Sequence, residues 1–236
     1  MSTPSMSTEY DAARDGAAVI VRDDRAIVRV FGRDPVKMIH GLVTNDVAGA
    51  SADRAVYALL LTPKGKMLAD LRVLRRDGDL LLDVPAAALD NVTTTLKKFV
   101  PPLFARFETA DTLAELSVHG SSAAALLGEV LGAPLPEGMA EDDIVRRGVG
   151  DVRNGVGEGG DEEHAHGDGG DGAGAVGDDG SDGRVYAVRS LYAGIDGYDV
   201  IGAAATVAAL RDRLAAVGAR PMSHATLEVL RIEAGR

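Results

Sequence analysis

The sequence predicts an α+β fold with mixed or antiparallel sheets and packed helices. Segments of strand character and segments of helical spacing follow one another without strict alternation, whereas a doubly wound parallel sheet alternates them. Turn sequences such as Thr62–Gly65 and Arg75–Asp79 separate short apolar runs, which is typical of antiparallel meanders. The chain has 236 residues, of which 46% are hydrophobic and 4% aromatic, so Leu, Val and Ala must fill the core.

The first half of the chain is expected to form one subdomain over residues 17–110, preceded by a flexible polar N-terminus at residues 1–16. Its strands are predicted at residues 17–21, 26–31, 56–62, 67–75, 80–84 and 104–107, the first two flanking one turn. A short helix is predicted after Asp34 as N-cap, with Pro35 in its first turn. A second helix is predicted from Pro85 to Phe99, where apolar residues recur at helical spacing.

The second subdomain is expected over residues 111–236. Its strands are predicted at residues 113–119, 144–149, 184–189 and 197–201. Helices are predicted at residues 121–131 and 205–217, and a last one begins after Ser223 as N-cap. Residues 151–183 hold twelve glycines and ten acidic residues, so this span cannot bury enough surface to offset its ordering entropy. We expect a disordered acidic insertion there.

Composition excludes several kinds of site and partner. Absence of cysteine rules out disulfides, thiolate metal sites and cysteine nucleophiles, and it is typical of a cytoplasmic protein. No apolar run approaches 18 residues and no signal peptide is evident, so no membrane association is expected. His164 and His166 lie among acids, but a flexible segment does not preorganise ligands, so we expect no metal site.

The net charge of −11 is concentrated in one segment. Residues 151–184 contain ten acidic residues and two arginines, and the rest of the chain is therefore close to neutral. Net charge thus gives no indication of a nucleic-acid partner, although it leaves local basic patches open.

Asp70 is the residue in the central hairpin that most needs an explanation. It interrupts the apolar run Met67–Val73, and a charge within an apolar strand is costly unless it is paired or faces a wet cavity. Spacing alone favours the solvent face of a half-buried strand, and a carboxylate directed into a ligand pocket is the alternative. Asn45 and Asp46, in the preceding loop, are typical loop formers whose side chains bond nearby backbone groups.

Four segments, in this order and spacing, carry a family resemblance: Gly41–Val47, Pro63–Val73, Leu96–Phe99 and Arg231–Gly235. They resemble the folate-binding YgfZ proteins, relatives of the glycine-cleavage T-protein, an aminomethyltransferase. The resemblance runs from about residue 17 to the end, excluding the insertion. It implies T-protein-like folate-binding domains, and it implies that the C-terminal barrel domain, with a Lys-Gly-Cys segment of the YgfZ branch, is absent from this chain.

The resemblance also implies a cofactor, tetrahydrofolate or another reduced folate, and a set of residues around it. In the T-protein an aspartate at the position of Asp70 contacts tetrahydrofolate and is tied to one-carbon transfer. The residues expected at the folate site are Asp70, Asn45, Asp46, Lys64, Lys66, Tyr198 and Asp199. Asp199 matches a pterin-binding Glu and is one methylene shorter.

Two departures weaken the expectation of catalysis. The T-protein pattern has an Asn where this chain has Pro85, and an Arg where this chain has Leu227. The resemblance therefore favours a folate-binding accessory protein for the assembly or repair of iron–sulfur enzymes, with iron–sulfur client or assembly proteins as partners. An aminomethyltransferase that transfers a one-carbon unit to tetrahydrofolate is the alternative. A truncated chain that binds nothing well is the third possibility.

Overall fold

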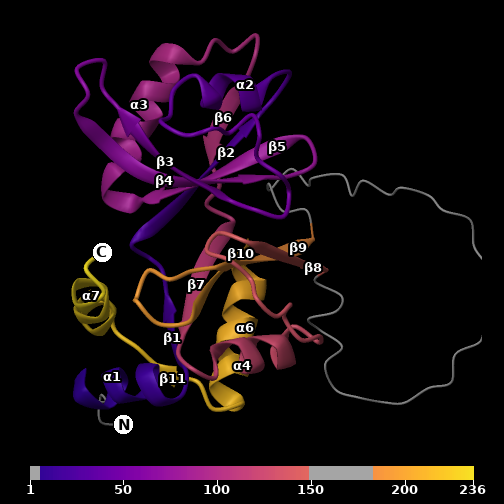
Figure 1. Ribbon diagram of the computed structural model, residues 1–236. Helices are drawn as coiled ribbons and strands as arrows, with labels where there is room; N and C mark the ends of the chain where they lie inside the picture. The colour runs from indigo at the N-terminus through magenta and orange to yellow at the C-terminus, as the bar shows by residue number, and fades with distance from the viewer. Residues whose placement is uncertain (1–5, 149–182) are drawn as a thin grey trace, which may run out of the picture.

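The structure is a computed structural model that describes residues 6–148 and 183–236. The two sheets are stacked one above the other in Figure 1, and each has its own covering helices. In the described residues every strand pair is antiparallel except β1 with β11, which confirms the α+β class with a mixed and an antiparallel sheet. No closed barrel occurs among these residues, and none of their helices is long and apolar enough to cross a membrane.

The five-stranded sheet has the order β3-β4-β5-β2-β6. Its strands are β2 (Arg25–Phe31), β3 (Val56–Leu61), β4 (Met67–Arg75), β5 (Asp79–Pro85) and β6 (Arg106–Thr109). Two helices, α2 (Pro35–His40) and α3 (Leu89–Phe99), cover one face, and the 3-10 turn η1 (Ala86–Ala88) precedes α3. Ile39 of α2 and Leu96 of α3 pack in one apolar cluster with strand residues such as Val73. Every second residue of the strands and the apolar positions at helical spacing therefore form a common core.

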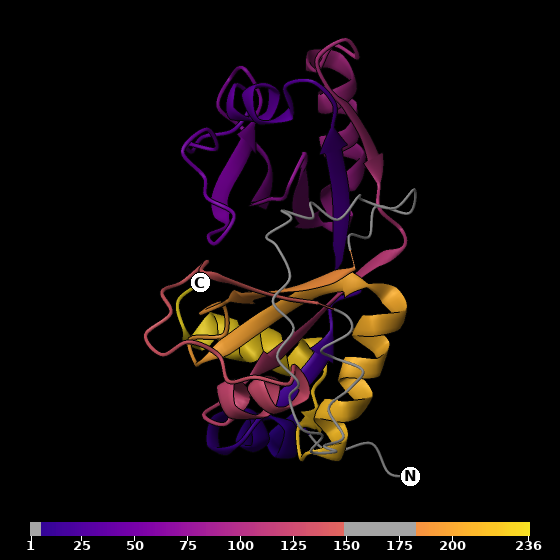
Figure 2. The same ribbon diagram turned by 90° about the vertical axis from the view of Figure 1, so that its right-hand side faces the viewer.

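The six-stranded sheet has the order β11-β1-β7-β10-β9-β8. Its strands are β1 (Ala18–Val21), β7 (Leu113–His119), β8 (Ile144–Gly148), β9 (Arg184–Arg189), β10 (Gly197–Ala203) and β11 (Arg220–Pro221). One face packs on α4 (Ala123–Val130) and α6 (Ala204–Ala216), whereas α1 (Met6–Asp15) and α7 (His224–Glu233) lie against the other (Figure 2).

A separate apolar cluster joins the two sheets to each other. Leu74 and Leu81 of the five-stranded sheet pack with Tyr186 and Ile201 of the six-stranded sheet, and all four are buried. The side of the five-stranded sheet that lacks helices therefore has an apolar partner. This contact fixes the two sheets against each other and sets the relative position of polar residues along its edge.

The expectation of a flexible N-terminus is wrong for residues 6–15. This polar segment forms α1, which buries Ala13 and places the carboxylate of Glu9 at the start of α7. Oε2 of Glu9 accepts hydrogen bonds from the Ser223 amide at 2.9 Å and from the Thr226 hydroxyl at 2.6 Å. The sequence shows a polar helix without an apolar stripe, and its stability comes from this tertiary contact.

The two strands that flank the first turn belong to different sheets. β1 pairs with β7 and β11, whereas β2 pairs with β5 and β6, so the short turn between them connects two sheets and forms no hairpin. The first structural unit therefore starts at β2, and residues 6–21 belong with the second. The expected strand at residues 104–107 is found at Arg106–Thr109. The acidic insertion, with His164 and His166, lies outside the described residues apart from its last residue, Gly183.

Candidate functional site

A cavity of about 590 Å³ lies where the two sheets meet, and residues of both line it. This volume is in the range of small-molecule sites. The lining is unusually rich in charge for a protein interior. It comprises five arginines, four carboxylates, two tyrosines and one serine: Arg22, Arg25, Arg72, Arg231, Arg236, Asp70, Glu141, Asp142, Asp199, Tyr57, Tyr192 and Ser190.

Arg72 holds the inner wall of this cavity together. It projects from β4, and 11% of its side chain is exposed. Its guanidinium donates to Asp199 Oδ2 at 2.6 Å, to Asp83 Oδ2 at 2.9 Å and to Glu115 Oε1 at 3.2 Å. Arg25 adds a bond from Nε to Asp83 Oδ1 at 2.7 Å. Because Asp199 and Glu115 belong to the six-stranded sheet, Arg72 links both sheets through charge-assisted hydrogen bonds.

Asp199 is fully committed to this network. Burial disfavours its charged form, but the positive charges of Arg72 and Arg22 hold the pKa of Asp199 well below its usual range. Oδ1 accepts a short hydrogen bond from the Ser117 hydroxyl and lies 3.8 Å from Arg22 Nη1. Both carboxylate oxygens therefore have protein partners, and Asp199 remains ionised at neutral pH.

Glu115 shows the opposite shift in pKa. Burial and the neighbouring charge of Asp83 raise the pKa of Glu115 well above its usual range. Oε2 of Glu115 is buried and has no hydrogen-bond partner among the described residues. Glu115 thus differs from Asp83 and Asp199, whose pKa values the neighbouring arginines hold below the usual range.

Asp70 lies on the same strand as Arg72, two residues before it, but differs from Asp199 in its surroundings. It lines the cavity, and 37% of its side chain is exposed. Its nearest ion-pair partner in the described residues is Arg25, whose Nη1 lies 4.0 Å from Oδ2, and no hydrogen bond to its carboxylate is present there. Asp70 is therefore a carboxylate of the cavity wall that still has room to accept hydrogen bonds.

Comparison with known proteins identifies the family of this fold. The profile of the GCVT N-terminal domain matches residues 2–139, more than half of the chain. The chain belongs to the GCVT N-terminal domain family. The fold is similar to that of the glycine cleavage system aminomethyltransferase T from Bartonella henselae, with a TM-score of 0.74. The match covers 98% of this chain and 54% of that protein. At 18% identity this match shows a shared GCVT fold.

Sequence relatives agree with this family and confirm the resemblance to YgfZ proteins. A tRNA-modifying protein YgfZ from Yersinia enterocolitica is 34% identical over 132 residues, which cover 55% of this chain and 38% of the relative. An iron-sulfur cluster assembly factor IBA57 homolog from Mycosarcoma maydis is 38% identical over 88 residues, or 32% of this chain and 22% of the relative. The match thus spans well under half the length of these curated relatives.

The other residues expected at the folate site lie outside the cavity lining of this GCVT domain. Asn45 donates from Nδ2 to the carbonyl of Tyr57 at 2.9 Å and accepts from the Asp46 amide at 2.8 Å. Asp46 accepts from the Gly49 amide at 2.9 Å. These are the local loop roles that the residue types indicated, although Asn45 also fixes the backbone of Tyr57, which does line the cavity.

Lys64, Lys66 and Tyr198 are likewise separate from the lining. Both lysines are exposed in the turn between β3 and β4. Tyr198 is 5% exposed and packs into the core between the six-stranded sheet and its helices α4 and α6. The alternation of β10 explains this, because Tyr198 and Asp199 point to opposite faces of the sheet.

Several cavity residues were missed by sequence reasoning. Arg72 was detectable, because it shares one strand face with Asp70 and is a second charge in an apolar strand. Arg22 and Arg25 looked like turn residues, and their position between two sheets depends on the pairing of β1 and β2. Arg231 lies one helical turn after Leu227, so the domain does place an arginine from its last helix at the cavity.

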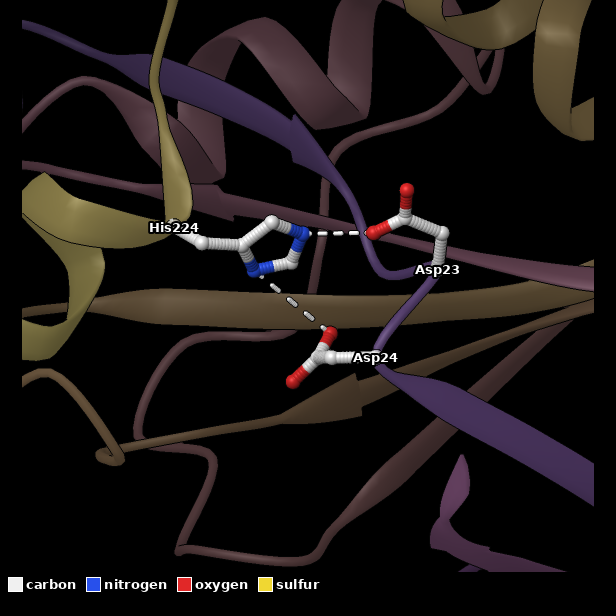
Figure 3. A group of neighbouring side chains, drawn as sticks. All are labelled: Asp23, Asp24 and His224. Atoms are coloured by element: carbon white, nitrogen blue, oxygen red, sulfur yellow. Dashed lines mark hydrogen bonds and ion pairs between the residues drawn. The ribbon is translucent and has the colours of Figure 1, made fainter. Parts of the chain in front are cut away.

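A second group of polar residues connects α7 with the segment between the sheets. Nε2 of His224 lies 2.6 Å from Asp23 Oδ1, and Nδ1 lies 3.7 Å from Asp24 Oδ1 (Figure 3). Arg22 binds Asp24 through both Nε at 2.8 Å and Nη2 at 3.0 Å. The two aspartates face different ring nitrogens and all three residues are exposed. We therefore interpret the group as a set of polar contacts in which Asp24 binds Arg22 and His224 lies against Asp23 and Asp24.

Proposed function

We propose that the cavity binds a reduced folate, and that the protein is a cytoplasmic, folate-binding accessory protein for the assembly or repair of iron–sulfur enzymes. Asp70 is the observation that carries the folate proposal. It presents a partly exposed carboxylate without hydrogen bonds in the wall of a 590 Å³ cavity. A pterin ring offers adjacent N–H donors, and a carboxylate accepts two such donors at once.

The remaining lining fits the other parts of a folate. Tyr57 and Tyr192 provide aromatic surface for the pterin and aminobenzoyl rings. Arg231 and Arg236 are 26% and 46% exposed, respectively, so they are accessible to the carboxylates of the glutamate tail. Both arginines already pair with carboxylates, Glu228 and Glu141, which a folate tail would have to displace.

Binding without turnover is favoured by the state of Asp199. Its oxygens are taken up by Arg72 and Ser117, so it is unavailable to a pterin. The family resemblance assigns pterin binding to a longer Glu at this position, and this chain has one fewer carboxylate for the ligand. The role in iron–sulfur enzymes is supported by the name of the Mycosarcoma maydis relative, an iron-sulfur cluster assembly factor homolog.

Calorimetric titration with 5-formyltetrahydrofolate tests the folate proposal. The wild-type chain should release heat with one saturable site, and Asp70→Asn should weaken binding about ten- to 100-fold, because charge-assisted hydrogen bonds contribute about 1.5–3 kcal/mol. Asp111→Asn is the matched control, since Asp111 is exposed in a turn outside the cavity. Absence of heat, or equal affinity of wild type and Asp70→Asn, would remove the proposal.

A second assay separates the accessory role from catalysis. The chain is added to a glycine-cleavage reaction that lacks its aminomethyltransferase, with tetrahydrofolate present. We expect no turnover, whereas turnover that Asp70→Asn abolishes would establish the aminomethyltransferase alternative. In cells that lack this protein, the wild type should restore iron–sulfur enzyme activity and Asp70→Asn should not. Restoration by both would show that the cellular role does not depend on folate binding at Asp70.

A further inference from the structure

We propose that the far end of the five-stranded unit binds single-stranded nucleic acid. This apical patch combines five cationic side chains with three exposed apolar ones: Arg33, Lys37, Lys97, Lys98, Arg106, Phe99, Leu103 and Phe104. They come from the loop before α2, α2 itself, the end of α3, the loop after α3 and the start of β6. Figures 1 and 2 show that this loop lies at the end of the molecule away from the six-stranded sheet.

Two chain segments are held side by side to form the patch. The amide of Asp34, just before α2, donates to the carbonyl of Phe104 at 2.8 Å. Arg106 pairs with Phe31 at the adjoining ends of β6 and β2. These contacts place the segment that holds Arg33 beside the start of β6, and the short loop after α3 connects both to Lys97 and Lys98. The positive charge is therefore a product of the fold and is not visible as one basic run in the sequence.

The cations of the apical patch have no ion pairs within the described residues. Arginines at the cavity behave differently, since Arg22, Arg25 and Arg72 each contact at least one carboxylate within 3 Å. The dipole of α3 favours Lys97 and Lys98 at its C-terminal end. It does not account for Arg33 or Arg106, which lie in a loop and a strand. Unpaired charge that converges from several elements is typical of a surface for an anionic partner.

The apolar side chains of the patch are exposed at the end of α3 and on the loop that follows it. Phe99, Leu103 and Phe104 have 43%, 75% and 36% of their surface exposed. Pro101 and Pro102 begin the loop, and the Pro101 carbonyl accepts from the amides of Phe104 at 2.9 Å and Ala105 at 3.2 Å. A loop stiffened in this way presents its rings at little entropic cost on binding.

Rings beside cations favour single-stranded nucleic acid over other polyanions. Lys98 Nζ lies 5.1 Å from the centroid of the Phe99 ring, so charge and aromatic surface are adjacent. Unpaired bases stack on aromatic side chains while cations contact the phosphates, whereas duplex bases are already stacked on each other. The whole chain carries a net charge of −11, most of it in residues 151–184, so nucleic acid must bind locally at the patch. This inference is independent of the folate proposal and uses none of its residues.

Fluorescence anisotropy with a labelled oligouridylate tests the inference on the full chain. Lys97→Glu/Lys98→Glu should weaken binding at least tenfold. Each lost phosphate contact reduces the slope of log affinity against log salt by about 0.7, so the loss of two contacts should reduce the slope by about 1.4. Phe99→Ala/Phe104→Ala should weaken binding about tenfold per ring, and the Tyr double variant, which keeps both rings, should retain it. Arg211→Glu/Arg220→Glu, the same charge change on the six-stranded unit, is the control and should stay within twofold.

Several outcomes would overturn the inference. No saturable binding, or equal loss in the patch and control variants, would show that the patch is not a specific site. Equal binding of duplex RNA would rule out the single-stranded preference. An unchanged affinity in the Phe99→Ala/Phe104→Ala variant, with heparin as an equal competitor, would identify a general polyanion surface. Circular dichroism of each variant checks its folding, and the Tyr variant keeps the ring test valid if the alanine variant unfolds.

Discussion

Replacement of Arg72 by methionine should be one of the most destabilising changes on the cavity wall. Arg72 is nearly buried and donates to Asp83, Asp199 and Glu115 at 2.6–3.2 Å. Met fills a similar volume but leaves two ionised carboxylates without their main partner. Breaking a buried ion pair from one side costs about 3–5 kcal/mol, and Arg25 compensates for part of this at Asp83. We therefore expect the free energy of unfolding to fall by about 3–5 kcal/mol at pH 7.

Urea denaturation of wild type and Arg72→Met at pH 7 and at about pH 3 measures this. Arg72 lowers the native pKa of Asp199 and Asp83, so its contribution is present above the unfolded pKa near 4 and is lost as pH falls further. The difference between the two proteins should accordingly shrink in acid. Arg211→Met is the control, because its pair with Asp212 is exposed and contributes about 0–1 kcal/mol. A loss below about 1 kcal/mol for Arg72→Met would refute the argument that the network is held by Arg72.

Two further predictions concern residues of the six-stranded unit and the hairpin turn. His119 is fully buried, and burial lowers its pKa to about 4. The unfolded chain therefore binds the proton first, and the free energy of unfolding should fall as pH decreases from about 6.5 to 4. An NMR titration that gives this imidazole a pKa near 6.5 would contradict the prediction. Gly120→Ala should lower stability by about 3 kcal/mol or more, because φ is +132° and a Cβ would lie 2.2 Å from the Gly16 carbonyl oxygen. Gly65→Ala, at φ +76° in open space, should cost about 1 kcal/mol, and similar melting temperatures for the two variants would show that the clash is relieved.

Much of the secondary structure was predictable because it depends on local patterns. Ser223 was expected to cap the last helix, and its hydroxyl does accept from the Thr226 amide. Asp34 occupies the expected N-cap position before Pro35, but its side chain makes no capping hydrogen bond. The partners of strands were not predictable in this way. β1 has the same apolar character as β2, and only the long-range pairing with β7 and β11 assigns it to the other sheet.

The cavity was harder to predict than the fold for the same reason. Asp70 was identified by its charge in an apolar strand and by the family resemblance, and it does line the cavity. Asn45, Asp46, Lys64 and Lys66 lie in the segments that carry the family resemblance, yet none of them lines it. Arginines from three separate stretches of the chain do, and their convergence depends on how the two sheets are stacked. Residue type and spacing carry no information about that stacking.

The positions of Asp70 and Asp199 explain why one carboxylate is available to a ligand and the other is not. Asp70 and Arg72 share a strand face, and Arg72 draws Asp199 from the opposite sheet into hydrogen bonds with itself while Ser117 holds the second oxygen. A glutamate at residue 199 would carry its carboxylate one methylene further from β10, where it could no longer keep both contacts from the same backbone position. The shorter aspartate thus joins the two sheets, and Asp70 remains as the acceptor on the cavity wall. With Asp199 held in the inner network, the folate proposal depends on Asp70 as its acceptor.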